Sequence, residues 1–184
     1  MPFQKKILFP AAFFLLFASC SLKYENSSNA ENTVPEIITE GAVFCSMEDE
    51  KKLFSIQTEK MEQYQGGSRS CSQKLDFEFF NKDGTLQAQG KCNFLSANKN
   101  TGEYILCGDI KIEQTDNEIT VFAENLKWDE QTQCLYGQKN EKVTLTKKNL
   151  TVEGTGFCAN AADNQFSFSG QVHGMLTVGE EKEQ

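Results

Sequence analysis

Four segments of the chain repeat one pattern, in which apolar residues alternate with others and a small residue ends the run. They begin 32, 33 and 31 residues apart and read Phe54-Ser-Ile56-Gln-Thr58, Leu86-Gln-Ala88-Gln-Gly90, Ile119-Thr-Val121-Phe-Ala123 and Leu150-Thr-Val152-Glu-Gly154. A period of two places the apolar side chains on one face of a β-strand. Helical periodicity appears over no useful length, so the pattern predicts an all-β chain.

A return strand is expected after each segment, beyond a polar turn such as Asn81-Lys-Asp-Gly84. The four return strands are predicted at Leu75–Phe79, at Tyr104–Ile110, as a broken strand between Leu135 and Leu145, and at Phe166–Val172. Each repeat is then a long bent hairpin whose apolar face cannot be buried alone. If the hairpins stack side by side and fold over, they form an open twisted β-jelly roll with two facing antiparallel sheets, and this is the predicted fold.

Small residues in the strands are predicted to mark the bends. Gly90, Ala123 and Gly154 close three of the repeats. Glycine inside a strand often marks a corner or a bulge.

The first residues are typical of an export signal. Two lysines precede an apolar run from Ile7 to Phe17, and Ala18-Ser19-Cys20 follows. The run is shorter than the ~20 apolar residues of a membrane-spanning helix. Phe17-Ala18-Ser19-Cys20 resembles a bacterial lipobox, which predicts a lipidated Cys20. Plain secretion with an incidental Cys20 is the alternative.

These features divide the chain into four parts. Residues 1–19 are predicted to be a lipoprotein signal peptide, and residues 20–36 a lipidated N-terminus with a flexible tether. Residues 37–178 form the β-jelly roll, and residues 179–184 a disordered acidic tail.

The charge balance argues against a nucleic-acid partner, because 18 Lys and Arg stand against 26 Asp and Glu. The single histidine, His173, is predicted to be a solvated strand residue. The sequence has no G-x-S-x-G elbow, so we expect no enzyme. It also has no C-x-x-C pair, and we expect neither a metal site nor a cofactor.

The apolar faces of the strands define the candidate site. The same periodicity fits a filled core and a lipid-binding groove, and both interpretations stay open at this stage. The residues of the candidate acyl-chain groove are Phe54, Ile56, Phe77, Phe79, Leu86, Leu95, Tyr104, Leu106, Ile110, Ile119, Val121, Leu126, Trp128, Leu150, Val152, Phe157, Phe166 and Phe168.

Six cysteines follow Cys20, and an even number in an exported chain indicates disulfides. All six could instead stay reduced and pack as small apolar residues. If Ala97 pairs with Gly102, Cys92 lies opposite Cys107 with both side chains outward. That register makes Cys92 and Cys107 a candidate disulfide.

Several motifs resemble the LptC family of lipopolysaccharide-export proteins. They cover residues 54–174 and read Phe77-Glu-Phe79-Phe80-Asn-Lys-Asp83-Gly84-Thr-Leu86-Gln-Ala88-Gln-Gly90, Tyr104-x-Leu106-x-Gly108-Asp109-Ile110-x-Ile112, Ala123-Glu124-x-Leu126-x-Trp128-Asp129 and Gly154-x-Gly156-Phe157-x-Ala159. The related LptA/OstA proteins share the repeat, so the subfamily stays open.

The resemblance implies a periplasmic lipid-transfer protein without enzyme activity. Such a protein shields the acyl chains of lipopolysaccharide, or a related glycolipid, between its sheets. It takes the lipid from an inner-membrane ABC transporter and passes it to an LptA/OstA-like partner, which pairs with an edge strand.

Residues 37–47 and 165–178 would form the two edges. With Cys20 as a lipid anchor, we favour the inner membrane over the outer. The alternative is a surface β-sandwich lipoprotein that binds a protein or a glycan through its loops.

Overall fold

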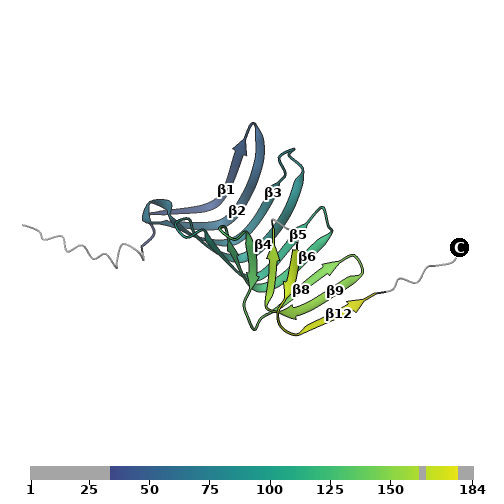
Figure 1. Ribbon diagram of the computed structural model, residues 1–184. Coiled ribbons are helices and arrows are strands. Elements are labelled where there is room, and N and C mark those ends of the chain that lie inside the picture. The colour runs from purple at the N-terminus through teal and green to yellow at the C-terminus, as the bar shows by residue number, and fades with distance from the viewer. Residues whose placement is uncertain (1–33, 162–164, 178–184) are drawn as a thin grey trace, which may run out of the picture.

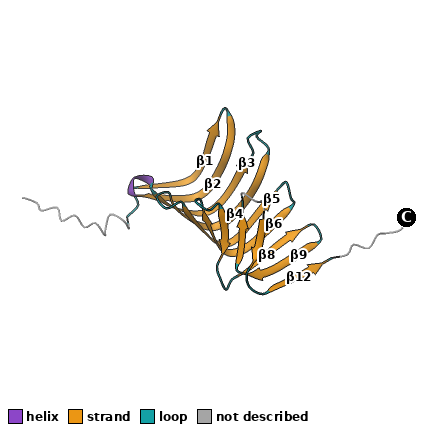
Figure 2. Ribbon diagram, viewed as in Figure 1, coloured by secondary structure: helices purple, strands orange, loops and turns teal. Residues whose placement is uncertain are grey.

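The computed structural model describes residues 34–161 and 165–177. The predicted signal peptide, Cys20 and the acidic tail therefore lie outside the described residues. The described part is all-β, as the sequence predicted, apart from a single 3-10 turn at Gln65–Gly67 (Figure 2). The strands are β1 Ile37–Glu48, β2 Lys51–Tyr64, β3 Arg69–Phe80, β4 Leu86–Asn98, β5 Glu103–Gln114, β6 Ile119–Asp129, β7 Cys134–Gly137, β8 Lys142–Lys147, β9 Leu150–Thr155, β10 Phe157–Asn160, β11 Gln165–Phe168 and β12 Val172–Leu176.

The strands β1 to β6 pair in sequence order as an antiparallel series, which then divides (Figure 1). The second half of β6 pairs with β7, and its first half pairs with β8. From there one branch continues through β10 to β11, and the other through β9 to β12. The first three predicted hairpins, including the broken return strand between Leu135 and Leu145, are confirmed. The fourth return strand, predicted as continuous over residues 166–172, is instead divided into β11 and β12, which pair with different strands.

The long strands interrupt their pairing along one line, which we call the fold line. It passes through Gly41, Glu59, Lys74, Asn93 and Asp109, which have no cross-strand partner in the ladders of β1 to β6. The backbone is left-handed at Gly41, Lys74 and Asp109, with φ of 60°, 48° and 48°. The left-handed residues bend the strands here and divide the sheet into two walls.

We name each wall after its last strand. The β12 wall contains the strand parts that continue into β8, β9 and β12, and the β11 wall those that continue into β7, β10 and β11. Polar contacts mark the outer side of the fold line, where Lys74 lies 2.9 Å from Glu59 and Asn93 donates a 2.8 Å hydrogen bond to Asp109. All four side chains are exposed.

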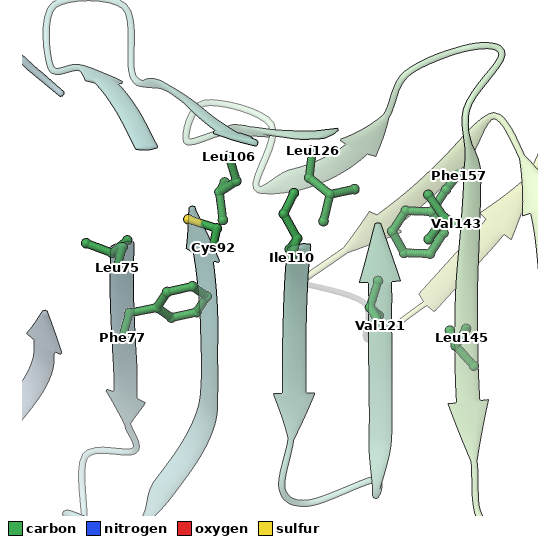
Figure 3. Packing of buried hydrophobic residues seen from close by; sticks show 10 residues of the cluster. All are labelled: Leu75, Phe77, Cys92, Leu106, Ile110, Val121, Leu126, Val143, Leu145 and Phe157. Carbon is green, nitrogen blue, oxygen red and sulfur yellow. The ribbon is translucent and has the colours of Figure 1, made fainter. Parts of the chain in front are cut away.

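The core fills the angle between the two walls on the inner side of the fold line. Ile110 and Leu126 are 1% exposed, and Val143 is fully buried. Figure 3 shows these side chains on neighbouring strands. The core cluster consists of Leu75, Phe77, Cys92, Leu106, Ile110, Val121, Leu126, Val143, Leu145 and Phe157.

The predicted bend positions are shifted. The bends lie beyond Gly90, Ala123 and Gly154, at Asn93, Glu124 and Gly156. Gly90 and Gly154 instead make room for rings, because a Cβ would lie 2.4 Å from Phe77 and 2.7 Å from Phe168, respectively. At these two positions the glycine therefore marks a ring packed over the strand.

The predicted β4–β5 register is wrong by two residues. Ala97 pairs with Tyr104 and Leu95 with Leu106. The connecting turn has four residues, as expected, but it is shifted by one residue to 99–102, and the Gly102 N–H closes it by donating a 2.9 Å bond to the Asn98 carbonyl. Gly102 has a φ of 68°, which glycine adopts easily.

Candidate functional site

The inner face of the β12 wall carries an uninterrupted cross-strand row, which we call the inner row. Each member is the Cα partner of the next, from one edge of the sheet to the other. Apart from two glycines, every member is apolar. The row contains Phe44, Ile56, Phe77, Gly90, Ile112, Val121, Leu145, Val152 and Gly174.

A second row, the mouth row, runs parallel to the inner row and farther from the fold line. Polar residues interrupt it, but it includes aromatic and aliphatic side chains at both ends. The row contains Ser46, Phe54, Phe79, Ala88, Gln114, Ile119, Lys147, Leu150 and Leu176.

The inner face of the β11 wall changes polarity along the molecule. On β1 to β3 its rows carry Thr39, Gln63, Ser70 and Ser72 beside Ile37 and Met61. From β4 onward the same rows become apolar, with Leu95, Ala97, Leu106, Tyr104, Leu126, Trp128, Leu135, Ala159 and Phe166. Two apolar walls therefore face each other only from β4 to the C-terminal edge.

Exposure rises with distance from the fold line. Val121 of the inner row is 8% exposed, whereas Phe79 and Leu150 of the mouth row are 43% and 36% exposed. Phe166, on the other wall, is 43% exposed. The core thus fills the narrow part of the angle, and apolar side chains stay accessible on its open side.

The predicted groove residues fall into three groups along this gradient. Buried in the core cluster are Phe77, Leu106, Ile110, Val121, Leu126 and Phe157, and packed against it are Ile56, Leu95, Ile119 and Phe168. The remaining residues lie outside the cluster and are Phe54, Phe79, Leu86, Tyr104, Trp128, Leu150, Val152 and Phe166.

Aromatic rings gather at both ends of the inner face. Phe79 packs 5.7 Å from Phe77 and 6.4 Å from Phe54, measured between ring centroids. At the C-terminal end, Phe168 lies 5.4 Å from Phe157 and 6.5 Å from Phe166. These clusters give each end of the face a broad apolar surface.

Among the inner-face residues that the predicted groove did not include are Phe44, Leu75 and Ile112. Leu75 and Ile112 each lie two residues from a predicted groove residue, Phe77 and Ile110, so the period of two places them on the same face. Phe44 lies two residues from the buried Ala42 on β1, so the same period places it on the inner face, but β1 precedes the first repeat.

The outer face of the β12 wall is mostly polar. Two hollows of about 390 and 800 Å³ lie here, and both are lined by Asp76, Lys91 and Lys111. Lys111 lies 2.6 Å from Glu113, and their hydrogen bond holds the pKa of that carboxyl below its usual range. Such neighbouring charges are typical of a solvated sheet face.

His173 lies on this outer face as a solvent-exposed strand residue, opposite Glu153 on β9. Glu153 bonds Lys142 at 2.7 Å, and this contact is the main reason that its pKa is lowered. Among residues 34–161 and 165–177, no group of three His, Cys, Asp or Glu side chains is placed to hold a metal. Nor does this part of the chain contain a helix long and apolar enough to cross a membrane.

The sheet ends in β1 on one side and in β11 and β12 on the other. β1 exposes apolar side chains, with Ile38 at 54% and Val43 at 61%. β12 exposes Val172, Met175 and Leu176, at 48%, 69% and 62%.

The hydrogen bonds of β12 show which of its backbone groups face outward. Thr155 N–H donates to Gln171 at 3.1 Å, and Thr177 N–H donates to Asn149 at 2.9 Å. In an antiparallel ladder this places residues 171, 173, 175 and 177 in bonded pairs with β9. The backbone groups of Val172, Gly174 and Leu176 then point away from β9, toward the edge.

The six cysteines of the described residues are free thiols. Cys92 is buried in the core opposite Leu75, not outward as predicted, and burial raises its pKa to about 11. Cys107 pairs with Phe94 and alternates with the buried Leu106, so it lies on the outer face. The expected Cys92–Cys107 pairing across the turn is therefore wrong, because its register is wrong.

Comparison with known proteins identifies the family. A family model described as "Lipopolysaccharide-assembly, LptC-related" matches residues 7–177. No curated protein matches the chain with significance.

One similar solved structure is LptH from Pseudomonas aeruginosa, described as the LptA homologous periplasmic component of the conserved lipopolysaccharide transport device. The match covers 68% of this chain and 95% of LptH, with a TM-score of 0.53 and 8% sequence identity. At this identity the likeness shows a shared fold. Since the family model spans nearly the whole chain, including all strands from β1 to β12, the chain belongs to the LptC-related family of lipopolysaccharide-assembly proteins.

Proposed function

We propose that this chain is a membrane-anchored periplasmic protein of lipopolysaccharide transport. It shields the acyl chains of lipopolysaccharide, or of a related glycolipid, between its two walls. It receives the lipid from an inner-membrane ABC transporter and passes it to an LptA/OstA-like periplasmic partner. The observation that carries this proposal is the inner row, which runs from β1 to β12 beside exposed apolar side chains.

The energetics of the inner face suit a carrier. Each methylene group that is shielded from water contributes ~0.8 kcal/mol. Even a short length of acyl chain bound on the inner face is therefore stabilised relative to the same chain exposed to water. Aliphatic and aromatic side chains such as Ile119 and Phe79 recognise no particular headgroup. An acyl chain can therefore shift along the row without breaking a directional bond.

The two edges suit transfer between proteins. A strand of a partner can pair with the outward backbone groups of β12, which is β-augmentation. If the partner has a similar fold, as LptH does, its inner face would continue the inner face of this chain.

The anchor belongs to the same proposal and rests on the sequence, since Cys20 lies outside the described residues. The chain is acidic, with a formal net charge of −8, which disfavours attraction to anionic headgroups. Acyl chains on Cys20 would supply the attachment, and two or more chains anchor stably.

The alternative, a loop-binding surface lipoprotein, has little support. The described turns are short, with two residues between β1 and β2 and four between β4 and β5. Such turns offer little surface for a protein or a glycan.

A matched pair of phenylalanines tests the proposal. Phe79 and Phe122 both lie on the β12 wall and are 43% and 41% exposed, but Phe79 is on the inner face and Phe122 on the outer, in the ladder position beside Lys111. Phe79→Glu should reduce several-fold the lipopolysaccharide that co-purifies with the full chain from a Gram-negative host, because a carboxylate on the inner face is costly to desolvate. Phe122→Glu should leave it unchanged.

Circular dichroism must show that both variants fold. Equal lipopolysaccharide content in the two folded variants would contradict the inner face as the binding site.

A further inference from the structure

We infer that Cys134 and Cys158 form a disulfide that joins β7 to β10 on the outer face of the β11 wall. Cys134 is the first residue of β7, and Cys158 is the second residue of β10. In the ladder Cys158 pairs with Tyr136 and Asn160 pairs with Cys134, so the two cysteines are diagonal neighbours.

Both side chains lie on the same side of the sheet. Leu135 pairs with Ala159 on the inner face, and the cysteines alternate with them. Cys134 is 7% exposed, and its thiol donates a 3.3 Å hydrogen bond to the Thr132 carbonyl. Burial raises the pKa of the Cys158 thiol, and the nearby Cys134 side chain raises it further.

The other cysteines are less well placed. Cys92 faces the core and Cys107 the outer face, so the sheet separates their thiols. Cys71 pairs with Glu62 and Ser96, and Cys45 lies opposite Ser55 on the β12 wall. Cys134 and Cys158 are thus, among the described cysteines, the pair on directly bonded strands whose side chains share a face.

A small adjustment completes the bond. Diagonal neighbours in an ideal ladder are ~7–8 Å apart between Cα atoms, whereas disulfides usually need ~4.4–6.8 Å. Cys134 follows Gln133, whose φ of 52° ends the preceding turn. Because Cys134 is a strand end and β7 has four residues, it can approach Cys158 without disturbing a long ladder.

The bond forms by exchange with an external disulfide, such as that of an exported thiol oxidase or oxidised glutathione. The thiolate of Cys158 attacks one sulfur of the donor, and the first donor thiolate leaves. The Cys134 thiolate then attacks the Cys158 sulfur of the mixed disulfide and displaces the second donor thiolate. The two protons end on the donor, which is reduced by two electrons to two thiols.

The crosslink would secure the part of the wall with the shortest strands. β7, β10 and β11 have four residues each, and β7 and β10 share only three paired positions. A covalent bond to β7 would hold β10 in place, and β10 is the strand with which β11 pairs.

Trypsin separates all six cysteines of the strands into different peptides, which makes the test direct. Cleavage after Lys and Arg places Cys134 in residues 128–139 and Cys158 in residues 149–182. The full chain is equilibrated with oxidised glutathione, its remaining thiols are alkylated, and it is digested without reductant. Mass spectrometry should find these two peptides joined, lighter by two hydrogen atoms than their sum, and separate after reduction.

Three variants complete the test. Cys134→Ser and Cys158→Ser should each abolish the joined species, while Cys92→Ser should retain it. Recovery of Cys134 and Cys158 as separately alkylated peptides after oxidation would overturn the inference, as would either cysteine joined to a third. Circular dichroism of each variant shows that the sheet is intact.

Discussion

The ring of Phe77 lies so close to Gly90 on the neighbouring strand that a Cβ at residue 90 would stand 2.4 Å from its Cζ atom. The Lys111 carbonyl on the other side would be 2.6 Å away. The missing side chain thus provides the space in which a core ring of the inner row packs. Gly154 and Phe168 repeat this relationship at the other end of the molecule.

Gly90→Ala should therefore destabilise the fold, by ~1–3 kcal/mol in the free energy of unfolding, because the ring or the strand must move. Urea unfolding followed by circular dichroism measures the change. Gly174→Ala is the matched control, since a Cβ there meets nothing within 4 Å, and it should change stability by less than about 0.5 kcal/mol. Similar losses in both variants would contradict the role given to the Phe77 ring.

Two substitutions at Lys74 test strain at the fold line. Lys74→Ala and Lys74→Gly both remove the ion pair with Glu59, but only glycine adopts a φ of 48° without strain. The glycine variant should be more stable than the alanine variant by about 1 kcal/mol. If alanine equals or exceeds glycine in urea unfolding, the left-handed backbone at this bend is not strained.

Cys92 should be alkylated far more slowly than the exposed Cys45 in the folded chain. With a pKa of about 11, little thiolate exists near neutral pH, and the rate should rise about tenfold per pH unit up to that value. In urea the two cysteines should react alike. A Cys92 rate that does not change with pH would show that opening of the core, not ionisation, limits the reaction.

The same shift affects stability in alkaline solution. The pKa of Cys92 is raised in the folded state. Below the ordinary cysteine pKa of about 8.5 the thiol is neutral in both the folded and the unfolded chain, so the free energy of unfolding does not depend on its titration there. The folded state should lose stability as the pH rises from there toward 11. Cys92→Ala should reduce this loss, as judged by urea midpoints measured between those pH values.

A proline in the edge strand tests docking without disturbing the sheet. The backbone N–H of Gly174 points away from β9, so Gly174→Pro should remove an outward donor and keep the internal ladder. Capture of an LptA/OstA-like partner should fall at least about fivefold, which corresponds to one backbone hydrogen bond. Gly174→Ala retains the N–H and should bind normally. Undiminished capture by the folded proline variant would exclude the β12 edge.

Cys20→Ala tests the anchor. The variant should leave the membrane fraction and lose metabolic labelling with a fatty acid, because the acylated thiol would be missing. Labelling that persists in the variant would refute lipidation at Cys20.

The strand repeats could be predicted from the sequence because a period of two is a local property. Even the interruption between β7 and β8 was visible, as a gap in the return strand. The fold line was not visible, since Lys74 adopts a left-handed backbone that lysine does not favour. The β4–β5 register also failed, because it depends on how Asn98 and Gly102 close the turn.

The candidate site could be predicted only in part. The residues of the inner face follow from alternation, but Val121 and Phe79 have the same pattern and very different exposure. What separates them is their distance from the fold line. That distance depends on where the strands bend, which no local pattern contains.

The change of polarity along the β11 wall makes the two ends of the molecule unequal for an apolar guest. Near β1 to β3 such a guest would touch phenylalanines on one side and hydroxyl or amide groups, such as those of Ser70 and Gln63, on the other. Beyond β4 it would meet apolar side chains on both sides, among them Trp128 and Phe166. The free energy of such a guest would therefore be lowest toward the β12 end, and this gradient would come from the sheet itself, without any moving part.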